Sequence, residues 1–225
     1  MTDRYAENIE VPRPVPSEAE RAKFQTMADA SAKHVASQCG AVLTFDEATH
    51  TYARDGKILP SVTQILKATG MIDATYYTDE TRQRGEIVAL GTELDDRGGT
   101  LDEDSPTIQE HMGYIRAWRA FRAQFGGEIV AIEKPVHHRF LEYAGTPDRE
   151  MHNRGTNVVG EIKTGSAAKW HRLQTAAYAD TYIIRPQRIA VYLSRSGTYR
   201  AMPHTDESDY DVWRGLVARF NWERT

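Results

Sequence analysis

A change of hydrophobic periodicity near residue 128 constrains the fold of this 225-residue chain more than any other feature of its sequence. Before that point, Ile115, Trp118 and Phe121 recur at helical spacing, and a pair of glycines ends the segment. After it the apolar runs are typical of strands, which we expect at 128–134, 143–150, 157–163, 188–194 and 198–203. Helices are expected at about 168–183 and from 206 to 222. This order predicts an α/β fold in which helices pack on a sheet.

The N-terminal residues differ in character from the rest of the chain. Prolines at positions 12, 14 and 16 favour an extended path, so we expect residues 1–40 to form an arm. An alanine- and charge-rich stretch within it, over 17–37, predicts a helix with a thin apolar stripe. We expect a single domain over 41–225, with helical additions before the sheet.

Several local signals predict the elements that begin this domain. Strand-like runs at 42–45 and 50–52, with an Asp-Gly turn at 55–56, predict a hairpin. Ser61 and Gln64 form a capping box that opens a short helix, which Gly70 ends. Two longer helices are expected over 78–96 and 106–125.

Composition restricts the class of protein. No apolar run approaches the ~18 residues that a membrane span needs, and residues 1–16 lack the apolar core of a secretory signal. The single cysteine, Cys39, excludes an internal disulfide and a four-cysteine zinc or iron–sulfur site. We therefore expect a cytoplasmic protein with no membrane partner.

Charge is unevenly distributed along the chain. The formal net charge of −4 argues against a generally basic nucleic-acid binder. Residues 134–200, however, carry eleven Lys/Arg and five Asp/Glu, whereas Glu93 to Asp104 holds six acids and one arginine. A basic segment in an acidic chain is typical of a local phosphate-binding surface, although a solvated mosaic of charges gives the same pattern.

The most informative residues lie on a predicted hairpin around Arg154-Gly155. If the hairpin is symmetric about that bond, paired residue numbers sum to 309, and Asp148 then lies opposite Glu161. Like charges in opposed positions are destabilising unless a cation lies between them, and carboxylate oxygens suit a hard ion such as Mg²⁺. Lys163, two residues after Glu161, points to the same face. The alternative is a charged face that is simply exposed to solvent.

The helix that follows the hairpin carries a second polar pair. Gln174 and Tyr178 are four residues apart and share one face, with Trp170 before them. Polar side chains that face a sheet need partners, so these two could contact metal-bound water or a nucleic-acid backbone near Asp148 and Glu161. The alternative is a half-buried helix in which Tyr178 belongs to the core.

The order of these motifs resembles a known family. Gly145-Thr-Pro-Asp148, then Glu161-Ile-Lys163, then Gln174-x-x-x-Tyr178 is similar to the RecB-type branch of the PD-(D/E)XK nuclease superfamily. Weaker similarity, over 42–222, extends to small stand-alone nucleases of bacteriophages and prophages. The resemblance implies a restriction-endonuclease-like core with a mixed central sheet flanked by helices.

The resemblance also implies roles for individual residues. Asp148, Glu161 and the Ile162 carbonyl would hold Mg²⁺ or Mn²⁺, and Lys163 would be the catalytic lysine. Gln174 and Tyr178 would form the third motif. Members of this family hydrolyse phosphodiester bonds by attack of a metal-bound water. Glu133 lies at the end of a predicted strand that leads toward the site, and family members often have an acid near this position.

The sequence departs from the family pattern on the 78–96 helix. Family members often have a further metal ligand there, but Ala89 stands at that position. Glu86 and Glu93 lie on the same helix face, so one of them is a candidate for the missing carboxylate; the alternative is that both are ordinary surface acids.

Basic residues near these motifs are candidates for contacts with the nucleic-acid backbone. The set comprises Arg84 and three residues that begin the 168–183 helix, Lys169, His171 and Arg172. Arg116, Arg119 and Arg122 recur every third residue on an earlier helix and could track phosphates, or could form a solvated face.

These features lead to one expected function and two alternatives. We expect an Mg²⁺- or Mn²⁺-dependent deoxyribonuclease, an exonuclease on the ends of duplex DNA in phage recombination or replication. A recombination or replication protein is expected as a further partner. A structure- or sequence-specific endonuclease is the first alternative. The second is a non-catalytic DNA-binding or protein-interaction module on a nuclease fold, weakened by the alanine at position 89.

Overall fold

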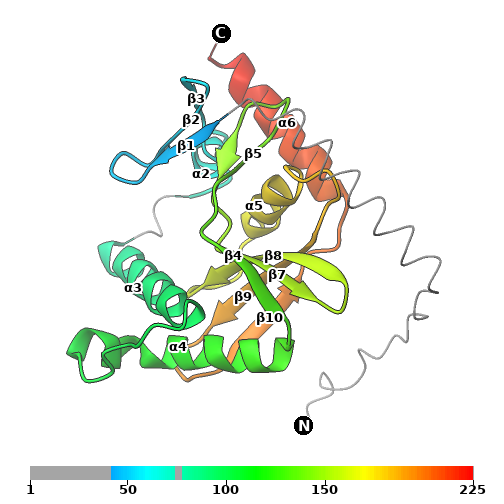
Figure 1. Ribbon diagram of the computed structural model, residues 1–225. Coiled ribbons are helices and arrows are strands. Elements are labelled where there is room, and N and C mark those ends of the chain that lie inside the picture. The colour runs from blue at the N-terminus through cyan, green and yellow to red at the C-terminus, as the bar shows by residue number, and fades with distance from the viewer. Residues whose placement is uncertain (1–41, 74–77, 225) are drawn as a thin grey trace, which may run out of the picture. The chain divides into compact units, whose positions relative to one another are not determined.

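The computed structural model describes residues 42–73 and 78–224, which belong to one compact unit over Val42–Thr225. The N-terminal arm and the helix expected at 17–37 lie outside the described residues. The unit is a mixed α/β structure, in which helices pack against a five-stranded sheet (Figure 1). None of the helices in the described ranges is long and apolar enough to cross a membrane.

The central sheet has the strand order β10-β9-β8-β7-β4. Its strands are β4 (Glu128–Ile132), β7 (Arg149–Asn153), β8 (Thr156–Lys163), β9 (Gln187–Leu193) and β10 (Tyr199–Pro203). The β8–β9 pair is parallel and the other three pairs are antiparallel, so the sheet is mixed. The parallel connection between β8 and β9 passes through a helix, as parallel pairing requires.

The predicted strand at 143–150 was wrong in one respect, because two strands share that stretch. β6 (Ala144–Gly145) pairs with β5 (Val136–His137) in a separate two-stranded sheet, and β7 begins only at Arg149. Pro147 lies between them, and a proline has no N–H to donate to a strand ladder. The break places Asp148 immediately before β7 of the central sheet.

The first hairpin extends into a small third sheet, β1-β2-β3, formed by β1 (Leu43–Asp46), β2 (Thr51–Arg54) and β3 (Lys57–Leu59). The Asp-Gly turn joins β2 to β3, and both residues have positive φ, at 51° for Asp55 and 79° for Gly56. That backbone is typical of a two-residue hairpin turn, which the sequence predicted.

The helices follow the predicted order closely. They are α2 (Val62–Ala68), α3 (Asp79–Asp96), α4 (Pro106–Phe125), α5 (Trp170–Ala179) and α6 (Ser208–Trp222). The predicted capping box is present at the start of α2, where Ser61 and Gln64 each accept a backbone N–H of the other. Gly126 ends α4 in the left-handed conformation, with φ of 64°.

Two adjacent valines of β8 show how the sheet divides the core. Val158 packs with α3 and α4 residues, including Val88 and Trp118, on one face. Val159 packs with α2, α5 and α6 residues, including Trp213, on the other face. Because side chains alternate along a strand, Glu161 and Lys163 share the Val159 face, beneath α5.

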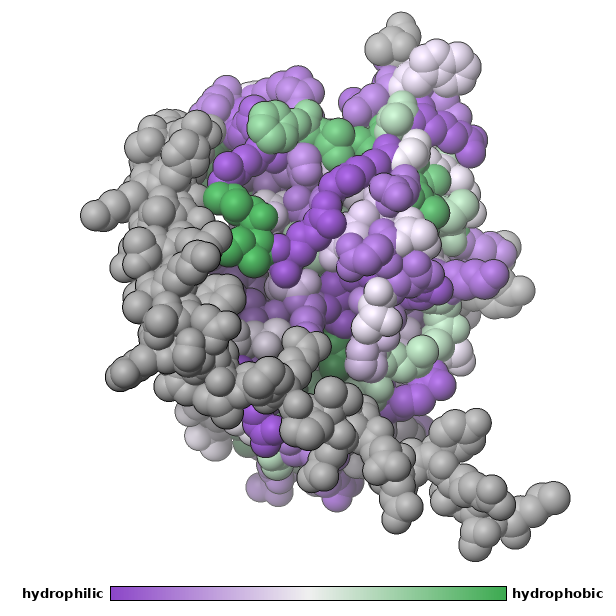
Figure 2. All heavy atoms as spheres, turned by 90° about the vertical axis from the view of Figure 1, so that its right-hand side faces the viewer, coloured by the Kyte–Doolittle hydropathy of each residue, from purple (hydrophilic) through white to green (hydrophobic). Residues whose placement is uncertain are grey.

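Figure 2 shows one side of the molecule, on which hydrophilic residues cover most of the described surface and hydrophobic residues appear only in small groups. This side of the molecule therefore shows no broad apolar face of the kind that marks a protein or membrane interface.

Candidate active site

The β7–β8 hairpin sets the geometry of the site. Its two-residue turn has positive φ at both positions, 48° for Arg154 and 80° for Gly155. The paired residues run from Asn153–Thr156 to Arg149–Gly160, so their numbers sum to 309 and the predicted register is confirmed. Asp148, the residue before β7, therefore lies beside Glu161.

Hydrogen bonds hold Asp148 against the end of β8. Its backbone N–H donates to Glu161 Oε1 at 3.4 Å, and its Oδ2 accepts the Ile162 N–H at 2.6 Å. Each carboxylate thus accepts a backbone N–H from the opposite strand, which holds the two side chains next to each other.

Glu161 is the most deeply buried acid of the site, with 1 % of the residue exposed. Burial, and then the nearby Asp148 carboxylate, raise the pKa of Glu161 to about 7, while Lys163 opposes this shift. Lys163 Nζ contacts Glu161 Oε2 at 2.6 Å and lies 5.6 Å from the centre of the Trp170 ring. The ammonium is thereby placed at the end of β8, in contact with the acid pair.

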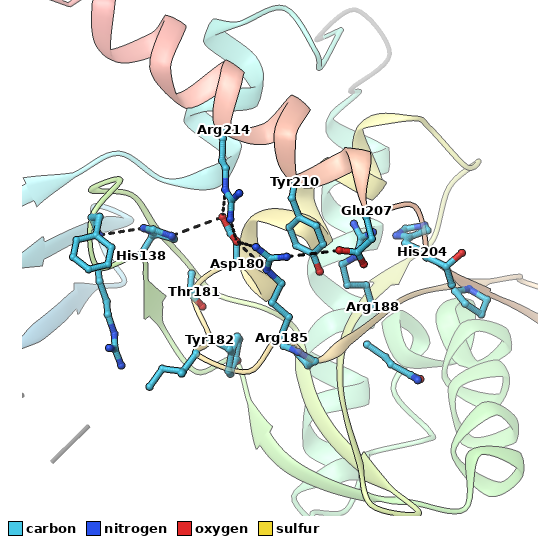
Figure 3. Close-up of a pocket in the computed structure, with 17 residues that line it drawn as sticks. His138, Asp180, Thr181, Tyr182, Arg185, Arg188, His204, Glu207, Tyr210 and Arg214 are labelled. Atoms are coloured by element: carbon cyan, nitrogen blue, oxygen red, sulfur yellow. Dashed lines mark hydrogen bonds and ion pairs between the residues drawn. The ribbon is translucent and has the colours of Figure 1, made fainter. Parts of the chain in front are cut away.

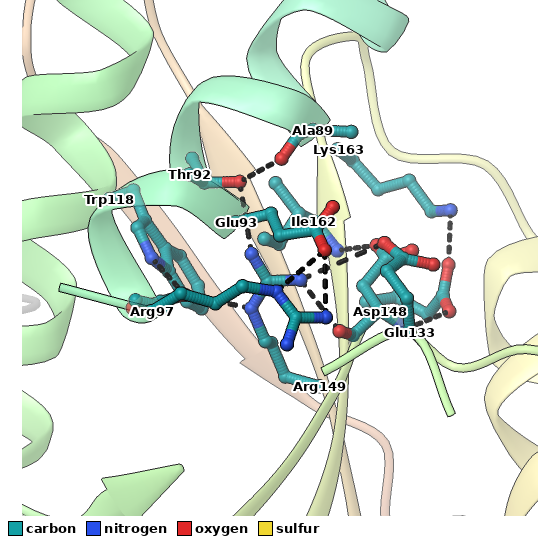
Figure 4. A network of polar contacts seen from close by, with 12 residues as sticks. Ala89, Thr92, Glu93, Arg97, Trp118, Glu133, Asp148, Arg149, Ile162 and Lys163 are labelled. Carbon is teal, nitrogen blue, oxygen red and sulfur yellow. Dashed lines mark hydrogen bonds and ion pairs between the residues drawn. The ribbon is translucent and has the colours of Figure 1, made fainter. Parts of the chain in front are cut away.

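Glu133 joins this pair from the end of β4. Figure 4 shows Glu133, Asp148 and Lys163 gathered beside β8. Glu133 has a left-handed backbone, with φ of 47°, and its N–H donates to the Asp148 carbonyl at 3.2 Å. Burial, followed by Asp148 and Glu161, raises its pKa to about 8. The structure therefore adds a third carboxylate to the two that the hairpin register predicted.

This arrangement fits a hard divalent cation chemically, because burial penalises the charges of Glu133 and Glu161, which lie beside the Asp148 carboxylate. Within residues 42–73 and 78–224, no three His, Cys, Asp or Glu side chains already form a metal-binding group. An ion here would therefore take Asp148, Glu161 and a backbone carbonyl, such as that of Ile162, together with water.

The raised pKa of Glu133 leads to a prediction about pH. A carboxyl whose pKa is raised from 4.5 to about 8 on folding stabilises the protein below pH 4.5, and this stability is lost as pH rises through 8. In EDTA, we expect Glu133→Gln to raise the thermal midpoint at pH 9 by about 2–4 °C relative to wild type, with a smaller difference at pH 6.

Glu128→Gln is the matched control, since Glu128 is exposed on the same strand. Thermal melts of the three proteins at both pH values measure the effect. An equal shift in both variants, or a lower midpoint for Glu133→Gln at pH 9, would contradict the placement of Glu133 among the acids.

Helix α5 covers the acids with the second polar pair. Gln174 Nε2 donates to the Tyr178 hydroxyl at 3.2 Å, and both residues are buried. Gln174 Oε1 is buried too, and the described part of the chain offers it no hydrogen-bond partner. Burial, followed by Glu161, raises the pKa of Tyr178 far above its usual value. The pair is therefore both part of the core and adjacent to the acids, and an unpaired buried acceptor there fits a bound water.

Gly145, in the first motif, allows this packing. A Cβ atom at that position would lie 2.5 Å from the Tyr178 ring and 3.1 Å from Val62. The first and third motifs therefore meet directly, which explains why a residue without a side chain stands three positions before Asp148.

Sequence reasoning missed Arg149, which is fully buried behind Asp148. Its guanidinium donates to Asp96 at 2.7 Å, to the Asp148 carbonyl at 2.7 Å and to Thr92 at 3.2 Å. Its Cζ also lies 5.6 Å from the Trp118 ring centre. The sequence did offer a signal, because Arg149 stands at a strand position that faces the core. A buried arginine there requires a buried acid as its partner.

Two of the residues expected to contact a nucleic-acid backbone, His171 and Arg172, already have partners within the protein, although the Arg172 side chain is 40 % exposed. His171 is buried, shares a hydrogen bond of 2.8 Å with the Tyr192 hydroxyl, and has its pKa lowered to about 3, mainly by burial. Arg172 contacts Asp206 at 2.6 Å and Asp209 at 2.8 Å. Both are occupied because α6 and β9 pack against the start of α5.

The other basic candidates differ in position. Lys169 is exposed before α5. Arg84 donates to Thr164 at 3.3 Å, directly after the catalytic-lysine candidate, so it does lie near the acid pair. On α4, Arg119 pairs with Asp95 and Arg122 with Asp96, which leaves these two arginines balanced by the acidic block rather than free for phosphates.

The two candidates for a further metal ligand on α3, Glu86 and Glu93, differ in their distance from the acid pair. Glu86 is largely exposed and pairs with Arg82 at 3.7 Å, so it does not contact the acid pair. Glu93 is paired with Arg97 at 2.8 Å, yet it is close enough to Glu133 to raise the pKa of that residue. Of the two, Glu93 is therefore the one that the structure brings toward the site.

A pocket of about 830 Å³ at another place on the molecule is rich in arginine (Figure 3). Asp180 at its centre contacts Arg214 at 2.7 Å, Arg185 at 3.1 Å and His138 at 3.7 Å. Arg185 also lies over the Tyr210 ring, at 4.2 Å. The ion pairs of Asp180 link the end of α5 to Arg214 of α6, which is typical of a structural network, and the described residues that line the pocket hold no cluster of acids like that beside β8. The acid site therefore remains the stronger candidate.

No protein-family model matches this sequence, and no curated protein matches it either. Among solved structures, the crystal structure of SSO0001 is similar, with 15 % sequence identity and a TM-score of 0.34. The similarity covers 72 % of this chain and 85 % of that one. A likeness this distant carries no weight for activity, so the function rests on the geometry of the site.

Proposed function

We propose that this chain is a metal-dependent deoxyribonuclease with a PD-(D/E)XK core of the RecB type. The observation that carries the proposal is the hairpin register, which sets Asp148 beside Glu161 with Lys163 Nζ 2.6 Å from the Glu161 carboxylate. The Gln174–Tyr178 pair above these residues supports the same assignment. Mixed sheet topology with helices on both faces is compatible with such a core.

Each residue of the site then has a chemical task. Asp148, Glu161 and the Ile162 carbonyl would hold Mg²⁺ or Mn²⁺, and such an ion would supply a nucleophilic water at neutral pH and stabilise negative charge on the phosphate. Lys163 orients that water or offsets charge on a phosphoryl oxygen, since its ammonium stands beside the acids. Gln174 Oε1 accepts a hydrogen bond from water at the site, because it is buried with no other partner in the described residues.

The proposed form of the enzyme is an exonuclease that digests DNA from its ends during recombination or replication. The test is to incubate the full chain with linear and circular double-stranded DNA, with Mg²⁺, with Mn²⁺ and with EDTA. We expect loss of the linear DNA only, and only with metal. Cutting of the circle would reassign the protein as an endonuclease. DNA that is bound but never cut would instead indicate a binding module.

A further inference from the structure

A second pocket, of about 820 Å³, opens beside the acid site. Glu93, Glu133 and Thr146 line one part of it, and Phe45 and His50 line another. Glu133 contacts Asp148 through its backbone, and Thr146 precedes Asp148 by two residues. The pocket therefore adjoins the acid site through Glu133 and Thr146, and its volume lies in the ~300–1,000 Å³ range of ligand sites.

Two rings of the β1–β2 hairpin, Phe45 and His50, line this pocket, and a third ring, Tyr52, lies behind them. Phe45 stacks on Tyr52, with ring centres 4.6 Å apart and an interplanar angle of 27°. His50 meets Phe45 edge-on at 5.2 Å. The buried Tyr52 shares a hydrogen bond of 2.8 Å with the Thr146 hydroxyl, through its own hydroxyl group. This bond ties the aromatic wall to the strand end that carries Asp148.

The three rings are buried to different extents, which leaves aromatic surface available to a ligand. Tyr52 is 2 % exposed and belongs to a small core with Leu59 and Ala144. Phe45 is only partly buried against that core, and His50 is exposed. The inner ring thus holds the hairpin in place, while the outer two present aromatic surface to the pocket.

We propose that this pocket receives one unpaired nucleobase of the strand being cut, stacked on Phe45 and flanked by His50. The inference rests on the proposed nuclease function and names its substrate as a strand with unpaired nucleotides at the site, such as a single strand or a frayed DNA end. A base inside a duplex has both faces covered by its neighbours, whereas an unpaired base is free to stack on an aromatic side chain.

The charges of the pocket add a condition. Its one arginine, Arg97, pairs with Glu93 at 2.8 Å, and Glu47 adds a further negative charge. Phosphates are therefore repelled unless a divalent cation compensates the acids of the adjoining site. Base stacking in the pocket and metal binding at the acids should therefore act together, so we expect a DNA strand to bind tightly only when Mg²⁺ is present.

The experiment uses the full chain with Lys163→Ala, which keeps DNA intact during the measurement. A single-stranded oligonucleotide with a terminal 5-iododeoxyuridine is added with Mg²⁺ or EDTA, irradiated, and the crosslinked peptide is identified by mass spectrometry. Affinities for this strand and for a blunt duplex are measured by fluorescence anisotropy. We expect an Mg²⁺-dependent crosslink at Phe45 or His50 and tighter binding of the single strand.

Three variants in the same background sharpen the test. Phe45→Leu keeps apolar bulk for the hairpin core but removes the ring, and His50→Ala removes an exposed side chain. We expect about tenfold weaker single-strand binding for Phe45→Leu, and a smaller loss for His50→Ala. Phe140→Ala is the control, since Phe140 is 84 % exposed and does not line this pocket; its affinity should stay within twofold.

The outcomes separate the two proposals. If wild type cuts DNA with Mg²⁺ but the crosslink lies elsewhere, or Phe45→Leu binds the single strand as tightly as Phe140→Ala, the base pocket is overturned and the nuclease stands. If wild type neither cuts nor binds DNA with any metal, both fail. A basic peptide that binds in EDTA and depends on Phe45 would reassign the pocket to a cationic ligand.

Discussion

Lys163→Ala should lower the rate of metal-dependent DNA cleavage by about 100-fold or more. Lys163 is the one lysine whose ammonium contacts the buried acid pair, with Nζ 2.6 Å from Glu161 among the described contacts. A positioned charge that faces developing negative charge in a desolvated site is worth roughly 10²–10³ in kcat. The measurement is kcat on a linear DNA substrate at saturating Mg²⁺. Binding of DNA by the variant should change far less than turnover.

Two further variants make this result specific. Lys67→Ala removes an exposed lysine from the last turn of α2 and should leave kcat within twofold. Lys163→Arg retains the charge with a different shape, so we expect partial activity between those of Lys163→Ala and wild type. Thermal melts must show that all three variants fold. A folded Lys163→Ala protein with undiminished kcat would remove Lys163 from the catalytic mechanism.

The acid pair was predictable because it depends on local rules. A two-residue turn at Arg154-Gly155 fixes which residues of β7 and β8 face each other, and the period of two then fixes their face. The start of α2 and the end of α4 were predictable for the same reason, since the cap at Ser61 and the stop at Gly126 involve only neighbouring residues. The helix expected at 168–183 is shorter, Trp170–Ala179.

The remainder of the site depends on contacts between distant segments. Glu133 reaches the acids because β4 pairs with β7, with a register shift between Ile129 and Ala131 that no local pattern specifies. His171 looked like a surface residue at the start of a helix, but its burial depends on Tyr192, which lies 21 residues later. Contacts of this kind depend on which helices and strands pack together, so no short stretch of the sequence predicts them.

Arg149→Met should reduce the free energy of unfolding by about 3–5 kcal/mol. The guanidinium is fully buried and bonds to Asp96, whose side chain is only 6 % exposed. Methionine fills most of the space but leaves that carboxylate buried without its main partner. The same change removes one of the donors to the Asp148 carbonyl, at 2.7 Å, so Asp148 should be held less firmly. Urea unfolding gives the stability, and calorimetry with Mg²⁺ gives the effect on the proposed metal site.

Arg154→Met is the matched control, since Arg154 is exposed in the turn of the same hairpin and its replacement should cost less than about 0.5 kcal/mol. The double variant Arg149→Met/Asp96→Leu also removes the buried carboxylate, so we expect it to recover part of the lost stability. Recovery should be incomplete, because Trp118 and Arg122 also lose their contact with Asp96. Recovery of stability without recovery of Mg²⁺ binding would show that Arg149 has two separable roles, one toward Asp96 and one toward Asp148. An unchanged urea midpoint in Arg149→Met would contradict both, because a buried, triply bonded arginine cannot be lost without a cost.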